Sequence, residues 1–194
     1  MVAENGGSVL LYLPNKTDQL AIELVGWLDE QEWVGAIATD IAAVATHKYA
    51  SISDIGLYGP RSPDVVVTMR SVETGHSSPL ERSGTSTGGV VGAGSHGGGT
   101  PAELHNTMIA SGPSFLSSPS GIRSQIASGN IDVAPTVLEL LGIPVPGHME
   151  GRILTEALVG GTGAIVPAST NSSEQSPIVH TTTTGEKTYI CEFG

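Results

Sequence analysis

The sequence predicts an α/β fold with a largely parallel sheet, and two stretches of the chain carry this prediction. Between Ser8 and Thr39 the order is strand, helix, strand, which is typical of a βαβ unit. The run Asp64–Met69 is continuous, rich in β-branched residues and preceded by Pro63, so it predicts a central strand covered on both faces. Aromatic residues make up only 4% of the chain, so the core must consist mainly of Val, Ile, Leu and Ala.

The first strand of this unit is predicted over Ser8–Leu13, a short apolar run that Pro14 ends. Thr17 can then cap a helix that ends near Glu30. The second strand is predicted over Val34–Thr39. Apolar side chains at helical spacing should form one buried face of the helix: Leu20, Leu24, Val25, Trp27 and Leu28.

The amino-acid composition changes in the middle of the chain. Residues Ser71–Gly99 are dominated by Gly, Ser and Thr, which predicts a flexible linker or flap. Thr100–Glu103 then combines a capping hydroxyl, a proline in the first turn and a glutamate three residues after the cap. This capping box predicts a helix that continues to about Ala110 and stops before Gly112.

A second clear helix is predicted with Asp132 as its cap and Gly142 as its stop signal. A shorter helix should cover Ile153–Leu158. The Ser/Thr-rich stretch Gly160–Gly185 is expected to be poorly ordered, and Thr188–Phe193 is expected to form a last edge strand. The expected organisation is therefore one domain over residues 1–160, with the flexible loop at 71–99, followed by a tail over 161–194.

Composition excludes several classes of partner. The net charge is −11 with only eight Lys and Arg, which argues against nucleic acid and against a polybasic membrane patch. No stretch approaches the ~20 apolar residues of a membrane helix. Met1–Asn15 lacks the pattern of a signal peptide, and Cys191 is the only cysteine, so no intrachain disulfide is expected.

His96 is the one candidate metal ligand. It lies in the glycine-rich run Gly92–Gly99, where glycines on both sides would let the backbone approach a ligand closely and place the imidazole in a cleft. The competing interpretation is a histidine in a flexible loop. The run matches neither a phosphate-binding P-loop nor a dinucleotide fingerprint. The other histidines have no partner at metal-ligand spacing and are assigned no site: His47, His76, His105, His148 and His180.

Three motifs in order resemble a known family. Gly94-Ser95-His96-Gly97, followed by the segment Pro101–Phe115, looks like the late metal-binding segment of type I phosphodiesterase/nucleotide pyrophosphatases and their alkaline-phosphatase and sulfatase relatives. Asn130–Pro144 is similar to the family's Asp-x-x-Pro-Thr helix. Met149–Leu154 resembles the Met-x-Gly-Arg-x-Leu segment that follows this helix.

This resemblance implies part of an alkaline-phosphatase-like layered α/β/α domain. It implies that His96 is one of three ligands on one of two Zn²⁺ ions, beside an aspartate and a second histidine. The intact enzyme would act on a small-molecule phosphate ester, and relatives are often periplasmic or secreted. Asp132 is expected to cap its helix rather than bind metal, and Arg152 is assigned no role.

The sequence departs from the family pattern in its earlier motifs. No Asp-His dipeptide occurs, no aspartate has a histidine four residues later, and no nucleophile is recognisable, so no catalytic residue is assigned. The expectation is therefore a C-terminal fragment of a zinc-dependent phosphoric ester hydrolase, inactive in isolation. Two alternatives stay open: a non-catalytic alkaline-phosphatase-like structural or binding module, and a fragment of a sulfatase or phosphomonoesterase.

Overall fold

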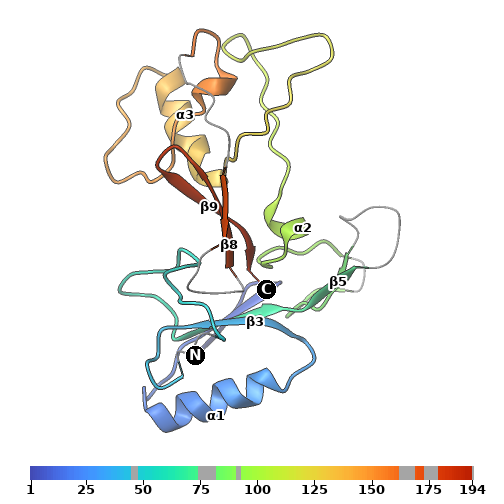
Figure 1. Cartoon of the computed structure of the whole chain (residues 1–194), viewed down its shortest axis with the longest axis vertical. Coiled ribbons are helices and arrows are strands. Elements are labelled where there is room, and N and C mark those ends of the chain that lie inside the picture. Colours follow the sequence, from blue (N-terminus) through green and yellow to red (C-terminus); the bar gives the residue numbers. More distant parts are fainter. Residues whose placement is uncertain (45–47, 74–81, 91–92, 162–168, 173–178, 194) are drawn as a thin grey trace. The chain divides into compact units, whose positions relative to one another are not determined.

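The computed structural model describes residues 1–44, 48–73, 82–90, 93–161, 169–172 and 179–193 (Figure 1). The chain divides into two compact units. Unit 1 comprises Met1–Asn106, Ser172–His180 and Ile190–Gly194. Unit 2 comprises Thr107–Asn171 and Thr181–Tyr189. No helix in the described part of the chain is both long enough and apolar enough to cross a bilayer.

Unit 1 contains a four-stranded sheet in the order β1-β2-β4-β3. Its strands are β1 (Val2–Glu4), β2 (Ser8–Leu11), β3 (Val34–Thr39) and β4 (Val65–Met69). Each of its three ladders is antiparallel. The strands expected from the sequence are therefore present, but their pairing is different.

The predicted parallel sheet and the layered α/β/α fold are wrong, because the described strands form a small mixed α+β structure with antiparallel sheets. Strands β2 and β3 do run in the same direction, since both are antiparallel to β4. The helix α1 (Asp18–Asp29) connects them, as in a βαβ unit, but β4 lies between the two strands. This is a split βαβ arrangement. Hydrophobic periodicity reports burial and not strand direction, so the sequence pattern could not reveal the inserted strand.

Strand β4 is central and covered on both faces, as the sequence predicted. All five of its residues are buried. On one face Val65 and Val67 pack in a core cluster with residues of α1 and its neighbours: Ala21, Val25, Leu28, Ile37 and Val44. On the other face Val66 belongs to a second cluster with Ala36, Ala38, Ala50, Ile52, Val179 and Phe193.

Helix α1 begins where the sequence predicted. The Thr17 hydroxyl accepts a hydrogen bond from the Leu20 amide at 3.3 Å, which satisfies one of the free donors of the first turn. The predicted buried face is partly wrong, because Leu20 and Trp27 are 36% and 52% exposed. The buried stripe instead contains Ala21, Val25 and Leu28.

Two short strands lie within the segment that was expected to be a flexible linker. Strands β5 (Ser71–Glu73) and β6 (Arg82–Gly84) form an antiparallel pair, so this part of the expectation is wrong. Residues 74–81 and 91–92 lie outside the described residues. The composition of the segment shows its glycines and serines but does not show the backbone pairing between Ser71–Glu73 and Arg82–Gly84.

The capping box that precedes helix α2 (Pro101–Leu104) is confirmed. The Glu103 carboxylate accepts hydrogen bonds from the Thr100 amide at 3.3 Å and from its hydroxyl at 2.7 Å. The predicted extension to Ala110 is wrong, because the helix ends at Leu104. None of its residues is buried, and a short helix without packing partners gains too little to propagate.

Unit 2 contains the 3-10 turn η1 (Asn130–Asp132) and the helix α3 (Val133–Leu140). The predicted stop signal is confirmed, since Gly142 has a φ of 66°. The Ile143 amide donates to the carbonyl oxygen of Leu138 at 2.9 Å, and the Gly142 amide donates to that of Glu139 at 3.0 Å. These two bonds form a Schellman motif. The short helix predicted near residue 155 is a 3-10 turn, η2 (Thr155–Ala157).

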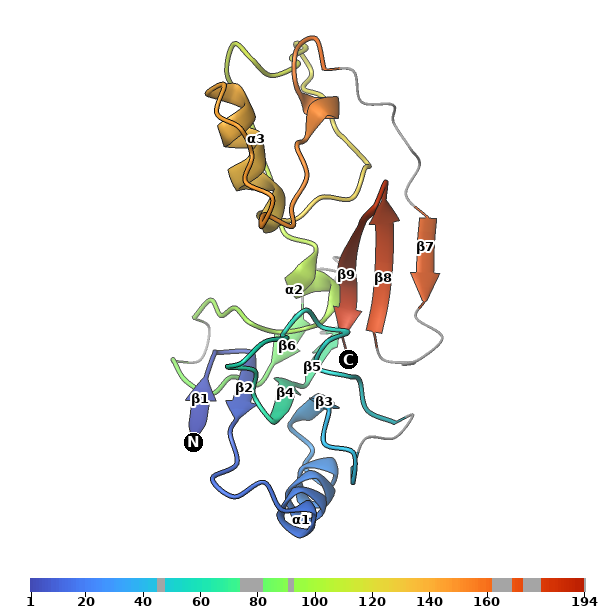
Figure 2. The ribbon, with the colours of Figure 1, turned by 90° about the vertical axis from the view of Figure 1, so that its left-hand side faces the viewer.

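The C-terminal residues form a three-stranded sheet in the order β7-β8-β9. Its strands are β7 (Ser169–Ser172), β8 (Val179–Thr184) and β9 (Lys187–Phe193). The predicted last edge strand is confirmed, and β8 and β9 run in opposite directions around Gly185 (Figure 2). The expectation of poor order over 160–185 fails for β7 and β8, while 162–168 and 173–178 lie outside the described residues.

Candidate functional site

His96 lies in unit 1, between β6 and α2, and its side chain is exposed. The glycines here make a close backbone contact within the chain, whereas the predicted approach of the backbone to a ligand stays a prediction. The carbonyl oxygen of His96 accepts a hydrogen bond from the Gly7 amide at 2.6 Å. The next residue, Gly97, has a φ of 85°, a conformation that side chains with a Cβ rarely adopt. The backbone at His96 is therefore held by contacts within the chain, while the residue itself is exposed.

The glycines around His96 are required by contacts within the chain. A Cβ added at Gly7 would lie 2.5 Å from the amide nitrogen of Gly98. A Cβ at Gly97 would collide with the carbonyl oxygen of Asn5, and one at Gly98 would collide with the Glu103 carboxylate. The glycine-rich run thus packs against the turn before β2, which gives these glycines a structural purpose independent of any ligand.

The residues around His96 do not form a zinc site by themselves. Zinc sites use at least three protein ligands from Cys, His, Asp or Glu. Within the described ranges, no group of three such residues could hold a metal ion. His105 is exposed just after α2, and His47 and His76 lie outside the described residues.

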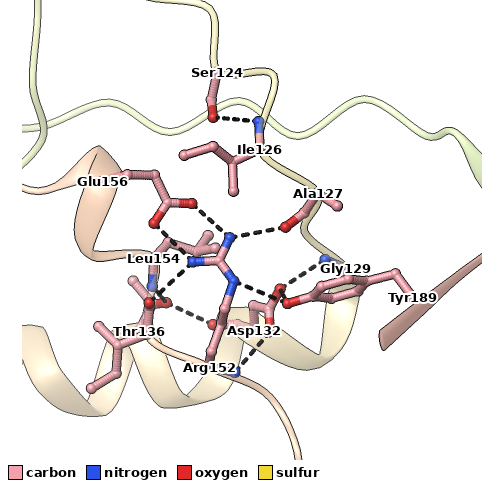
Figure 3. Close-up of polar contacts among 11 residues, drawn as sticks. Ser124, Ile126, Ala127, Gly129, Asp132, Thr136, Arg152, Leu154, Glu156 and Tyr189 are labelled. Carbon is pink, nitrogen blue, oxygen red and sulfur yellow. Dashed lines mark hydrogen bonds and ion pairs between the residues drawn. The ribbon is translucent and has the colours of Figure 1, made fainter. Parts of the chain in front are cut away.

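Asp132 is the centre of a buried polar cluster in unit 2 (Figure 3). Its side chain is fully buried and accepts three hydrogen bonds. The donors are the Gly129 amide at 2.8 Å, the Arg152 amide at 2.8 Å and the Tyr189 hydroxyl at 3.0 Å. Asp132 is the N-cap residue of α3, as predicted, but it has helical φ and ψ and its side chain makes no cap bond to α3. Side-chain caps typically have an extended backbone. The Asp132 carboxylate instead accepts the Gly129 amide in a capping box at η1.

Arg152 directs its guanidinium into the same cluster. It donates to both carboxylate oxygens of Glu156, at 2.8 and 2.6 Å. It also donates to the carbonyl oxygen of Ala127 at 2.9 Å and to the Tyr189 hydroxyl at 3.0 Å. The two charged side chains are only 16% and 9% exposed. The guanidinium donors are engaged within the protein, so the cluster supports a structural role for Arg152.

The electrostatics of the cluster keep its ions charged near neutral pH. Hydrogen bonds to Glu156 raise the pKa of Arg152 despite its burial. Burial raises the pKa of Glu156, but the hydrogen bonds and the charge of Arg152 outweigh this and lower that pKa overall. Burial and the hydrogen bond to Asp132 raise the pKa of Tyr189 to about 12. None of these shifts moves a group toward pH 7, as acid–base catalysis would require.

The pKa of Tyr189 predicts how the stability of unit 2 depends on pH. The tyrosine ionises near pH 10 in the unfolded chain but near pH 12 in the folded one, so its stabilising contribution is complete below about pH 10 and lost toward pH 12. Urea unfolding followed by circular dichroism should show this loss between about pH 10 and pH 12. Tyr189→Phe should cost about 1 kcal/mol at neutral pH and reduce the alkaline loss. An unchanged alkaline loss in this variant would contradict the assignment.

Three members of the cluster were not predicted from the sequence: Glu156, Tyr189 and Thr136. Glu156 lies four residues after Arg152, a spacing at which opposite charges pair on a helix, so this signal was available. Tyr189 is far from Asp132 in the sequence, and only folding brings the two side chains together. Thr136 completes the cluster through its hydroxyl, which donates to the carbonyl oxygen of Asp132 at 2.7 Å.

No family model, curated protein or solved structure matches the chain.

Proposed function

We propose that this chain is the C-terminal part of a zinc-dependent phosphoric ester hydrolase and that His96 is one of its zinc ligands. One observation carries the proposal: the imidazole of His96 is exposed on a backbone that a hydrogen bond and three glycine contacts hold in place. A metal ligand needs this combination of an accessible donor atom and a rigid support.

The order of the three motifs along the chain is the second support. They place a Gly-Ser-His-Gly segment before the Asp132 helix and the Gly151-Arg152 pair, as in the phosphodiesterase/nucleotide pyrophosphatase family. The sheet lends no support, because its ladders are antiparallel. The proposal thus depends on His96 and on the order of the three sequence motifs, and not on the arrangement of the strands.

The remaining ligands and the nucleophile would have to lie outside these 194 residues. A single imidazole cannot hold Zn²⁺ tightly, since catalytic zinc sites use three protein ligands. The chain alone is therefore expected to show no turnover of bis-p-nitrophenyl phosphate with added Zn²⁺. The negative net charge is compatible with a phosphate substrate, because bound metal ions supply local positive charge.

Sequencing the transcript on the 5′ side of the Met1 codon tests the proposal. It should encode, in frame, further His and Asp residues and a Ser or Thr nucleophile. In the resulting longer protein, His96→Ala should remove about one Zn²⁺ per chain and lower kcat/KM at least about a hundredfold. His105→Ala is the matched control, an exposed histidine of the same segment, and should leave both quantities unchanged.

A non-catalytic binding module is the second candidate, and exposed apolar side chains on α3 favour it. Val133 and Val137 are each 46% exposed, and Leu141 at the end of the helix is 66% exposed. Apolar side chains gathered on one exposed element are typical of a surface that contacts another protein. For such a module, His96→Ala would change neither zinc content nor activity. That result would contradict the hydrolase proposal.

A further inference from the structure

We infer that the Asn5-Gly6 pair is a modification site, at which Asn5 deamidates spontaneously to aspartate and isoaspartate. The pair lies in the turn between β1 and β2. The chain contains five asparagines, and Asn5 is the only one that glycine follows. The inference is independent of the proposed function, because the reaction needs no metal ion.

The reaction begins when the Gly6 amide nitrogen attacks the side-chain carbonyl carbon of Asn5. The new C–N bond closes a cyclic imide, and the side-chain nitrogen leaves as ammonia with the proton that the Gly6 amide gave up. Water then adds to either imide carbonyl and opens the ring, which gives aspartate or isoaspartate. No oxidant or reductant takes part. In isoaspartate the main chain runs through the side-chain carbon, so the backbone is longer by one methylene group.

The Gly6 amide is available for this attack. It donates no hydrogen bond to any residue that the structure describes. The next amide, that of Gly7, differs in this respect, because it donates to the carbonyl oxygen of His96 at 2.6 Å. An amide without an acceptor gives up its proton to hydroxide more readily than a bonded one. Gly6 also lacks a Cβ, so no side chain shields its nitrogen from Asn5 or from solvent.

The Asn5 side chain is exposed and only weakly held. Its Nδ2 donates to the Ser8 hydroxyl at 3.3 Å, which is longer than the usual range of about 2.7–3.2 Å for such bonds. Gly97 leaves space beside the same amide group, since a Cβ at this position would lie 2.5 Å from Asn5 Nδ2. The side-chain carbonyl carbon can therefore rotate toward the Gly6 nitrogen.

The contacts of the turn determine what the product changes. The Asn5 amide donates to the carbonyl oxygen of Ser8 at 2.9 Å, and the Gly6 carbonyl oxygen accepts from the Thr87 amide at 3.0 Å. An extra methylene group between Asn5 and Gly6 moves these partners out of register. The product also adds a carboxylate to a chain whose net charge is already −11. Isoaspartate should therefore loosen the contact between this turn and Thr87.

Incubation of the folded chain in mildly alkaline buffer tests the inference. Peptide mass spectrometry measures deamidation at each asparagine, and methyl transfer from S-adenosylmethionine by a protein isoaspartate methyltransferase detects isoaspartate. Asn5 should react at least roughly tenfold faster than the four asparagines whose next residue carries a side chain, Asn15, Asn106, Asn130 and Asn171. Its rate should rise with pH, because hydroxide removes the amide proton. A rate at Asn5 no higher than at the other four would overturn the inference.

The same incubation in urea shows whether folding permits the reaction. The rate at Asn5 in the folded chain should stay within roughly tenfold of the rate in the unfolded chain, because the amide and the side chain are both accessible. A larger reduction would show that the turn protects Asn5 and would contradict the inference. Asn5→Gln should abolish the isoaspartate signal, since the longer side chain closes its ring far more slowly. Asn15→Gln, at another exposed asparagine, is the matched control and should leave the signal unchanged.

Discussion

Replacing Arg152 with alanine is expected to lower the free energy of unfolding of unit 2 by about 3–5 kcal/mol, because it leaves a buried charge without its partner. Glu156, whose side chain is 9% exposed in the parent chain, would lose both of its hydrogen bonds from the guanidinium. The carbonyl oxygen of Ala127 and the Tyr189 hydroxyl would each lose a donor as well. Unpaired buried polar groups bear the full cost of their desolvation.

Urea unfolding followed by far-ultraviolet circular dichroism, together with amide exchange of α3, measures this effect. Tryptophan fluorescence is unsuitable, because both tryptophans, Trp27 and Trp33, belong to unit 1. Arg123→Ala is the matched control, since Arg123 is an exposed arginine of the same unit and should change stability by less than about 0.5 kcal/mol. A loss below about 1 kcal/mol in Arg152→Ala would show that the cluster does not stabilise unit 2.

A double substitution separates the charge effect from packing. Arg152→Met combined with Glu156→Leu removes both ions and keeps apolar volume at the two positions. It should cost less than Arg152→Ala alone, because no unpaired charge is left in the interior. The double substitution should also change how the free energy of unfolding of unit 2 depends on acidic pH. Since the pKa of Glu156 is lowered in the folded chain, its stabilising contribution is present above its unfolded pKa and lost as the pH falls through the folded one.

Leu28→Ala is expected to destabilise unit 1 by about 2–5 kcal/mol, the second large effect. Leu28 is 2% exposed and packs with Val25 and with Val65 and Val67 of the central strand. Removing its side chain leaves a cavity between α1 and the sheet, and dense packing limits how far the neighbours can relax.

Leu20→Ala on the same helix is the control for this substitution. Leu20 is 36% exposed, so the same chemical change should cost less than about 1 kcal/mol. Fluorescence of Trp27 and Trp33, whose rings lie 6.2 Å apart at the end of α1, reports unfolding of this unit. Equal costs for the two leucines would mean that α1 buries the face expected from its spacing and not the observed one.

Local signals in the sequence identified several elements at their observed positions. The Thr17 cap, the Gly142 stop and the β-branched run of β4 each act through the neighbouring backbone, and all three agree with the structure. The extent of α2 was overestimated, because capping chemistry starts a helix but burial decides how far it continues.

In the candidate site, too, the sequence indicated local features but not the contacts between distant segments. The glycines around His96 were interpreted as allowing approach to a ligand. In the structure they contact Asn5, Gly7 and Phe193, which are distant in the sequence and could not be named from it. In the same way, Asp132 was recognised as important for its helix, but its contact with Tyr189 was not foreseeable.

The sequence by itself therefore determined the features that depend on neighbouring residues. These are the helix caps, the glycine that stops a helix, the strand segments and the position of a histidine in a glycine-rich run. Folding alone decided that β4 lies antiparallel between β2 and β3, and that the last strand contacts the loop of His96. Both depend on pairing between segments far apart in the chain. Such pairing is selected by the burial and hydrogen bonding of the whole sheet, and no local pattern encodes it.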